Sequence, residues 1–369
     1  MKLSLLASIF VLMGCSVYAQ QPQLVSADLG TISWTNSLTQ GVVNIEWTQA
    51  LGNSWKQDWS SLRSRPITGS VMTAAVPMFF RVAAYPSIEW VIISNAHNAA
   101  DSTGYGAVNY SFRISKFEVN NDQYASFLNA VDPSGVNTSQ LYNISMGTES
   151  RGGISKLSLN PDGMKYLVRT NIFMQNKPVI YVSFWDACRF CNWMHNGQGS
   201  GNTETGAYDL VGVNPANTSV SRSPGARYFL PNEDEWYKAA YYYSAGANYW
   251  LYPTRANTAP TVATAASNGD IVVNSDWLAN YNRGAVWNNQ DGNLTSVGSG
   301  GPSSWSSYHV ADMAGNAEEW NESSFSTNSR VIRGGCWFDL EQFLRSTARN
   351  GMSPSNELSS VGFRIACPL

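Results

Sequence analysis

One cysteine near the C-terminus has the surroundings of a reactive group. Cys336 follows the pair Gly334-Gly335, and Arg333 comes just before that pair. A neighbouring arginine favours the thiolate, which is the form of cysteine that attacks electrophiles and binds soft metals. Cys336 is therefore a candidate nucleophile or single copper ligand. The alternative is a buried cysteine that only packs, or that pairs with Cys188.

A second pair of cysteines, Cys188 and Cys191, has CxxC spacing. Zinc would need a further pair of ligands, and the histidines, His97, His195 and His309, form no ligand grouping in the sequence. A redox dithiol would need an exposed thiolate, whereas both cysteines fall on the apolar stripe of the helix expected there. Packing together with one disulfide is the favoured interpretation.

The stretch 244–310 is rich in Asn, Gly, Ser and Thr and has little periodicity. So long an irregular segment needs a stabiliser other than core burial. Turn-rich oxygen donors occur at 280–281, at 291–293 and at 315–320, and calcium binds six to eight such oxygens. The alternative is a set of Asx turns and a solvated acidic pair.

Arginines and aromatic residues form another candidate site. Arg345 and Arg349 are four residues apart, so both can bind a carboxylate or sulfate, and Trp337 with the aromatic residues of 241–250 can stack on a peptide or sugar. Ordinary packing explains the same residues. Arg364, like Arg333, either takes part in binding or bridges backbone carbonyls.

Three strand-to-helix units must position these residues. Each has a β-type run, then a capping residue with an acid or amide three positions later, then an apolar stripe of helical period. The three runs and their capping pairs are 111–119 with Asn120 and Gln123, 178–182 with Ser183 and Asp186, and 227–230 with Asn232 and Glu235. We further expect a strand over 330–332, followed by Gly334-Gly335, which permits a turn with positive φ or a close backbone approach, and a final strand over 362–367.

The N-terminal part differs from the rest. Residues 1–19 have one lysine, a short apolar run and small residues before Gln20, which is typical of a secretory signal peptide. Leu12 to Cys15 can also be interpreted as a lipobox, which would place a lipid anchor on Cys15. Residues 20–85 show short apolar runs between turns and predict a small all-β module without chemistry of its own.

Composition excludes several classes. Charged residues make up 13% of the 369 residues and the net charge is −3, so nothing indicates a nucleic-acid partner. No apolar run is long enough for a transmembrane helix. We expect a secreted, periplasmic or cell-surface protein, for which disulfides are permitted.

The order of the motifs resembles the formylglycine-generating enzyme (sulfatase-modifying factor) family. RGGxW at 333–337, LRSxxR at 344–349 and GFR at 362–364 look like the family's C-terminal signature, and the three strand-to-helix units look like its earlier motifs. The resemblance implies an α+β, C-type-lectin-like fold of the formylglycine-generating type over residues 86–369, preceded by the small β module.

The resemblance also implies particular site residues. The family's two copper-binding cysteines correspond to Asp339 and Leu344, and its serine corresponds to Cys336, so the catalytic pair is lacking. A disulfide between Cys191 and Cys367 is implied by bonds in some members.

Two calcium sites are implied as well. One would use the side chains of Asn280 and Asp291 with the carbonyls of Tyr281 and Asn293. The other would use Glu319 with the carbonyls of Gly315 and Ala317.

Two functions remain open. The first is an exported, calcium-stabilised scaffold that binds an extracellular protein, peptide or glycan through 336–357, as in relatives with a diversified surface between the RGG and GFR anchors. Its predicted ligand-binding residues are Trp337, Asp339, Glu341, Arg345 and Arg349. The second is a metal-dependent oxidase of a protein cysteine or another thiol, with O₂ as oxidant, copper as cofactor and Cys336 as the catalytic sulfur.

Overall fold

The fold is described from a computed structural model covering residues 23–28, 31–35, 41–48, 65–75, 79–214 and 220–369. The predicted signal peptide and Cys15 lie outside these residues. None of the helices in the described residues is long and apolar enough to cross a membrane.

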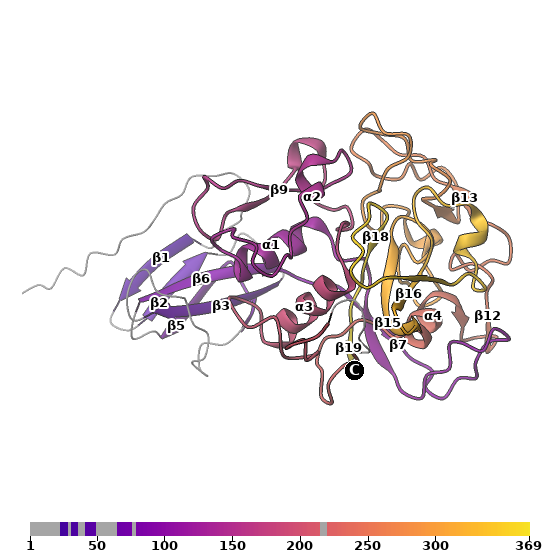
Figure 1. Cartoon of the computed structure of the whole chain (residues 1–369), viewed down its shortest axis with the longest axis horizontal. Helices are drawn as coiled ribbons and strands as arrows, with labels where there is room; N and C mark the ends of the chain where they lie inside the picture. Colours follow the sequence, from indigo (N-terminus) through magenta and orange to yellow (C-terminus); the bar gives the residue numbers. More distant parts are fainter. Residues whose placement is uncertain (1–22, 29–30, 36–40, 49–64, 76–78, 215–219) are drawn as a thin grey trace, which may run out of the picture.

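Two three-stranded antiparallel sheets form one end of the molecule (Figure 1). Their strand orders are β1-β2-β5 (Gln23–Asp28, Thr31–Thr35, Val71–Ala75) and β4-β3-β6 (Arg65–Pro66, Gly41–Thr48, Phe79–Pro86). The described part of 20–85 thus contains strands and no helix, as its alternating pattern indicates, while the boundary at residue 85 stays a prediction. Tyr85, near the end of β6, packs edge to face on Trp193 at 5.3 Å between ring centroids and joins this end to the main core.

Three helices begin at the predicted capping residues. Asn120, Ser183 and Asn232 each accept the N3 backbone N–H, and the N3 side chain accepts the cap's own N–H, so two backbone donors at the start of each helix are satisfied locally. The helices are α1 (Asn121–Val131), α3 (Phe184–His195) and α4 (Glu233–Tyr241), with a short α2 (Ser145–Thr148) between the first two.

Helices α1 and α3 pack through aromatic rings. Phe127 of α1 lies 5.4 Å from Phe190 and 5.3 Å from Trp193 of α3, and Phe190 lies 5.4 Å from Phe363 near the C-terminus. These residues belong to one large core cluster that also takes in Trp236 and Trp320. The end of the chain is therefore part of the core.

The remaining strands are short. A mixed sheet has the order β17-β16-β15-β18, and an antiparallel sheet has the order β19-β8-β7. Their bounds are β15 Glu318–Ser326, β16 Ser329–Arg333, β17 Asn350–Met352, β18 Val361–Gly362, β7 Trp90–Ile93, β8 Phe112–Ser115 and β19 Ala366–Pro368. Three two-stranded pairs complete the set: β9 Ile154–Lys156 with β10 Tyr166–Val168, β11 Tyr242–Tyr243 with β12 Asn248–Tyr249, and β13 Thr261–Val262 with β14 Leu278–Ala279.

Several expected strands are shorter than predicted or absent. The run 178–182 makes a single bridge, from Pro178 to Asn120, because proline lacks an N–H and Tyr181 has a left-handed φ of 60° that ends the extended chain. The run 227–230 also makes one bridge, from Phe229 to Ala366. The predicted strand over 111–119 is confined to β8, and that over 362–367 is divided between β18 and β19.

The buried side chain of Lys177 contacts the long loop 244–310. The Lys177 side chain is buried, and its Nζ donates to the carbonyl of Asn268 at 2.8 Å and to Ser296 Oγ at 2.7 Å. It also lies 4.8 Å from the ring centroid of Trp287, a favourable cation–π distance. The ammonium group of Lys177 therefore supplies part of the stabilisation that the loop 244–310 needs besides core burial.

Candidate functional site

The C-terminal hairpin turns sharply before Cys336. Strands β15 and β16 pair antiparallel, and the chain then passes through Gly334 (φ 102°) and Gly335 (φ 67°), as the Gly-Gly pair predicts. A Cβ atom on Gly335 would lie 2.8 Å from Leu344 Cδ2. The turn thus brings 336–344 back over the end of the sheet.

The structure does not activate Cys336. Its side chain is fully buried, and its backbone N–H donates to Asp339 Oδ2 at 2.9 Å. Burial raises the pKa of the Cys336 thiol well above its ordinary value, and the negative charge of Asp339 raises it further. Arg333 faces elsewhere, so the predicted stabilisation of a thiolate by this arginine is wrong.

Arg333 is instead the centre of a buried ion-pair group. Its Nε and Nη2 donate to Glu233 Oε1 at 2.9 and 2.6 Å, and its Nη1 donates to the carbonyls of Ser346 and Ala348. Arg349 Nε also donates to Glu233 Oε1, at 2.8 Å. Arg349, predicted to bind a ligand, is thus engaged with α4, and this group fixes 346–349 onto that helix.

Arg364 forms the second buried ion pair. Its Nε and Nη2 donate to the two oxygens of Glu319 at 2.6 and 2.7 Å, and Glu319 Oε2 also accepts from Trp236 Nε1 at 2.7 Å. The remaining Arg364 donors reach the carbonyls of Ser115, Lys116 and Ala311. For both Arg333 and Arg364, the expectation that they bridge backbone carbonyls is confirmed.

The other predicted ligand-binding residues differ in accessibility. Trp337 is only 6% exposed, and its Nε1 donates to the carbonyl of Ser359. Glu341 and Arg345 are about two-fifths exposed and pair at 3.6 Å, and Arg345 Nε donates to Tyr252 Oη at 2.8 Å. Asp339 is partly buried against Cys336.

Large apolar side chains occupy the exposed positions of the same segment. Phe338, Leu340 and Phe343 are 40%, 47% and 37% exposed. We call this set the apolar patch. Leu344 and Trp337, at either end of it, are buried. Sequence reasoning missed the patch, although the FxLxxF pattern between two buried positions was visible.

The first implied calcium site is only partly assembled. Asn280 is buried, its Nδ2 donates to the Asn293 carbonyl at 2.9 Å, and its Oδ1 has no hydrogen-bond partner among the described residues. An orphaned buried oxygen fits a cation ligand. The carboxylate of Asp291, however, is 78% exposed and pairs with Arg283, and the Tyr281 carbonyl accepts from the Gly284 N–H.

The second implied site does not fit calcium through Glu319, because Arg364 and Trp236 already occupy both Glu319 oxygens. Two acids that sequence reasoning missed lie beside it. Burial raises the pKa of Glu118, with Asp312 and Glu319 adding to the shift, and burial raises the pKa of Asp312 to about 6. Glu118 Oε2 has no partner within the described residues. Asp312, three residues before Gly315, was available as a signal in the sequence.

No cluster of three or more His, Cys, Asp and Glu side chains arranged for a metal ion occurs in the part of the chain that the structure describes. Gly315 forms a β-bridge with Asn280. The side-chain amide of Asn316 accepts from Asn280 in the first implied site and donates to Glu118 beside the second. Ala317 is buried between them.

The predicted disulfide between Cys191 and Cys367 is not formed. All four described cysteines, Cys188, Cys191, Cys336 and Cys367, are free and buried. Cys191 belongs to the core cluster, where burial raises its pKa, whereas Cys367 lies on β19 and interacts with Arg113. The bond implied by the family resemblance is therefore absent from the described residues.

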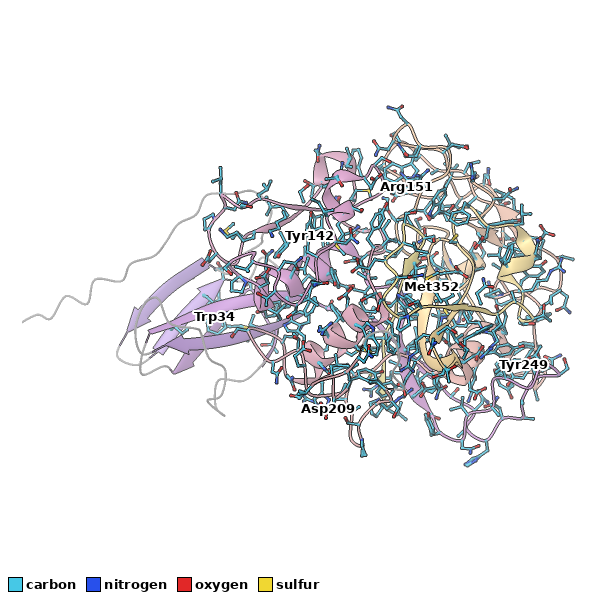
Figure 2. The ribbon with its side chains drawn as sticks, viewed as in Figure 1. Trp34, Tyr142, Arg151, Asp209, Tyr249 and Met352 are labelled. Atoms are coloured by element: carbon cyan, nitrogen blue, oxygen red, sulfur yellow. The ribbon has the colours of Figure 1, made fainter. Side chains whose placement is uncertain are left out.

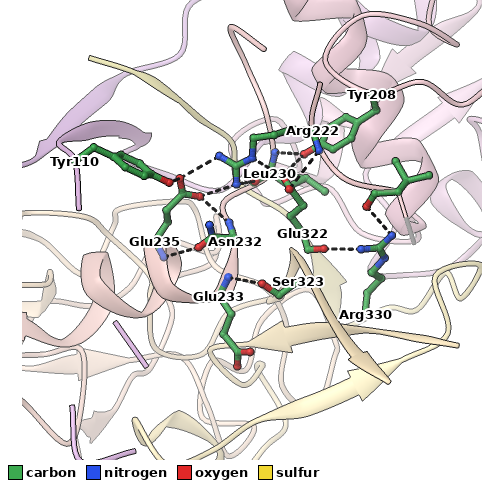
Figure 3. A network of polar contacts seen from close by, with 11 residues as sticks. Tyr110, Tyr208, Arg222, Leu230, Asn232, Glu233, Glu235, Glu322, Ser323 and Arg330 are labelled. Carbon is green, nitrogen blue, oxygen red and sulfur yellow. Dashed lines mark hydrogen bonds and ion pairs between the residues drawn. The ribbon is translucent and has the colours of Figure 1, made fainter. Parts of the chain in front are cut away.

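A surface hollow of about 250 Å³ lies beside β15 and is lined by Val220, Ser221, Glu322, Ser323, Ser324 and Arg330. Figure 3 shows the polar network next to it: Arg222 joins Glu235 of α4 to Glu322 of β15, at 2.8 and 2.6 Å. Tyr110 and Tyr208 donate to these two carboxylates. Arg222 pairs with both carboxylates, and each carboxylate also accepts from one tyrosine hydroxyl, so the network fits a structural role.

The comparisons with known proteins agree with this α+β architecture of short strands and capped helices. A family model described as "Sulfatase-modifying factor enzyme 1-like domain" matches residues 102–369. The chain therefore belongs to the sulfatase-modifying factor family and has its formylglycine-generating-type, C-type-lectin-like fold.

Solved structures give weaker similarities. CarF is 19% identical over 77% of this chain and 99% of its own, with a TM-score of 0.45. Treponema denticola variable protein 1 is 17% identical over 80% and 98%, with a TM-score of 0.39. PvdO from Pseudomonas aeruginosa is 15% identical over 96% and 100%, also with a TM-score of 0.39. No curated protein sequence matches.

Proposed function

We propose that this protein is an exported scaffold that binds an extracellular protein through the apolar patch of Phe338, Leu340 and Phe343. The observation that carries the proposal is the exposure of three large apolar side chains within six residues, at 40%, 47% and 37%. Single exposed apolar residues are ordinary, but several large ones exposed within one short segment favour a protein-binding site.

The patch is held on a fixed frame. The backbone N–H groups of Asn282 and Arg283 donate to the carbonyls of Asp339 and Trp337 at 2.7 and 2.8 Å, and Trp337 N–H donates to the Asn316 carbonyl at 3.0 Å. A frame fixed before binding lowers the conformational entropy that a partner must overcome. This supports recognition by a pre-formed surface.

The oxidase alternative has less support. It requires a reactive thiolate at residue 336, and burial together with Asp339 raises the pKa of Cys336. By the family resemblance, Asp339 and Leu344 correspond to the family's copper-binding cysteines. We therefore expect Cys336→Ser, which restores the family's serine, to leave partner binding unchanged.

The binding proposal is tested by photo-crosslinking from the surface of producing cells. A photoreactive residue at Gln342, which is exposed between the patch residues, should capture a specific protein, and the same residue at Ile144 should not. We expect Phe338→Ser, Leu340→Ser and Phe343→Ser together to weaken binding of the captured protein at least about tenfold, since central apolar contacts dominate such interfaces.

The matched control replaces three apolar residues that are even more exposed and lie elsewhere: Val136, Ile144 and Leu159, at 70%, 71% and 102% exposure. This triple serine variant should bind as the wild type does. Equal loss in both triple variants, or no species specific to position 342, would show that the patch is not the binding surface.

We also propose one stabilising calcium ion at Asn280. Calcium at about 100 times its dissociation constant stabilises the folded state by about 2.7 kcal/mol, which corresponds to a rise in Tm of roughly 5 to 10 °C for a domain of this size. The measurement is thermal unfolding in calcium and in chelator. Asn280→Ala should remove the difference, while Asp276→Asn, which changes an exposed acid of the same loop, should retain it. An identical Tm in calcium and chelator for the wild type would contradict the proposal.

A further inference from the structure

Four segments meet around the ring of Trp337. The guanidinium carbon of Arg151 lies 4.0 Å from the centroid of this ring, and Arg151 Nε and Nη2 donate to the Gly292 carbonyl at 3.0 and 2.8 Å. Figure 2 shows Arg151 at the rim of the molecule, where the segment after α2 approaches the long loop. The backbone N–H of Arg283 donates to the Trp337 carbonyl, and the charge of Arg283 interacts with that of Arg151, so a second arginine lies near this residue.

Gly292 allows this close approach. A Cβ atom there would lie 2.7 Å from Arg283 Cα and 3.0 Å from Trp337 Cε3, and the residue has a φ of 77°. Both facts require glycine at this position. The stacked arrangement of Arg151 on Trp337 is therefore built into the backbone.

Donor groups remain available on both arginines. Arg283 pairs through Nη1 with Asp291 at 3.1 Å, and both of these side chains are largely exposed, at 57% and 78%. Within the described residues, Arg151 Nη1 and Arg283 Nε and Nη2 donate to no protein group. The Asp291 carboxylate thus pairs with Arg283 alone, while Arg151 donates to the backbone carbonyls of Asp291 and Gly292.

The charges around Arg151 interact with one another. Burial lowers the pKa of Arg151, Tyr181 and Asp291 raise it, and the positive charge of Arg283 lowers it. Glu149, the other acid on this side, interacts with Tyr181. A second anion placed between the two guanidinium groups would relieve their mutual repulsion.

The rim of this site is apolar. Phe338 packs edge to face on Trp337 at 4.9 Å and is 40% exposed, and Leu358, whose carbonyl accepts the Tyr181 N–H, is 41% exposed. Tyr181 is held at a φ of 60°, a strained conformation for an aromatic residue that is typical of binding sites. An anion bound here would have apolar neighbours.

We propose that Arg151 and Arg283 form, over the face of Trp337, a subsite for an acidic side chain flanked by apolar side chains in a peptide segment of the partner. The inference rests on the proposed function and names the chemistry of the partner. Planar guanidinium groups bind carboxylates through paired hydrogen bonds, and stacking on an aromatic ring holds one of them in place. The apolar rim favours a peptide over a glycan, because it offers surface for leucine or phenylalanine side chains.

The test uses an array of synthetic hexapeptides with a central Asp, Glu, Asn, Gln or Ala between Leu and Phe residues. We expect acid-centred peptides to bind the wild-type chain about tenfold more tightly than their amide counterparts, which corresponds to one charge-assisted contact. Arg151→Gln together with Arg283→Gln should abolish this preference. Lys156→Gln removes a positive charge from β9 and should preserve it.

Four results would overturn the inference. Equal binding of Asp and Asn peptides would exclude a carboxylate subsite, and an acid preference that survives in the double variant would place that subsite elsewhere. Binding of acidic glycans on an array, dependent on Arg151 and with no peptide bound, would exclude the peptide class. Retention of the crosslinked partner by the double variant at full affinity would reject this subsite while leaving the apolar patch intact.

Discussion

Arg364→Met is expected to lower the free energy of unfolding by about 3 to 5 kcal/mol, the range for breaking a buried ion pair from one side. Both Arg364 and Glu319 are almost completely buried, with side-chain exposures of 0% and 1%. Removing the guanidinium leaves Glu319 without its counter-charge, with the carboxyl groups of Glu118 and Asp312 nearby. It also leaves three backbone carbonyls without their donor.

Urea unfolding followed by tryptophan fluorescence measures this loss. The matched control is Arg283→Met, because Arg283 is 57% exposed and its ion pair with Asp291 lies in solvent. An exposed pair contributes about 0 to 1 kcal/mol, so the control should unfold close to the wild type. A loss of less than about 1 kcal/mol for Arg364→Met would mean that this pair does not hold the core together.

Glu233→Gln is expected to cost about 3 kcal/mol or more, since it leaves the buried guanidinium of Arg333 without its carboxylate. The side chains of Arg333 and Glu233 are 1% and 4% exposed, and Arg349 shares the same carboxylate. The two arginines would then face each other without an acid between them. Because Arg333 also holds the carbonyls of Ser346 and Ala348, the segment that follows the apolar patch should loosen.

Hydrogen exchange together with urea unfolding tests the Glu233→Gln variant. We expect faster exchange at 344–350 as well as lower global stability. Glu341→Gln is the control, because Glu341 is 41% exposed and pairs with Arg345 at 3.6 Å. If both variants unfold alike, the Arg333 group does not act as a structural anchor.

The sequence predicts what depends on local rules. The capping boxes at Asn120, Ser183 and Asn232 follow from residues three positions apart, and the positive φ values of Gly334 and Gly335 follow from the residue type. The family motifs predict the fold of the region that the family model matches.

The predictions that were wrong concern contacts between residues that are far apart in the sequence. Arg333 is close to Cys336 in the sequence, but its partner Glu233 is 100 residues away. The spacing in the sequence therefore could not show that the charge of Arg333 is paired with Glu233 rather than with a Cys336 thiolate. Asp291 was expected to share a site with Asn280, but the turn directs its carboxylate to Arg283. The exposure of Phe338, Leu340 and Phe343 depends on how 336–344 folds over the sheet, which no periodicity in the sequence reports.

The buried free cysteines have a consequence for the lifetime of the protein. Among the described residues, Cys188, Cys191 and Cys336 are fully buried and Cys367 is 6% exposed, so this part of the folded chain presents almost no thiol to an oxidant. In the oxidising compartment proposed for it, an unfolded chain would expose all four, and thiol–disulfide exchange would join them in non-native pairs. Each unfolding event then becomes irreversible. The half-life of the folded protein is therefore set by its rate of unfolding rather than by its equilibrium stability.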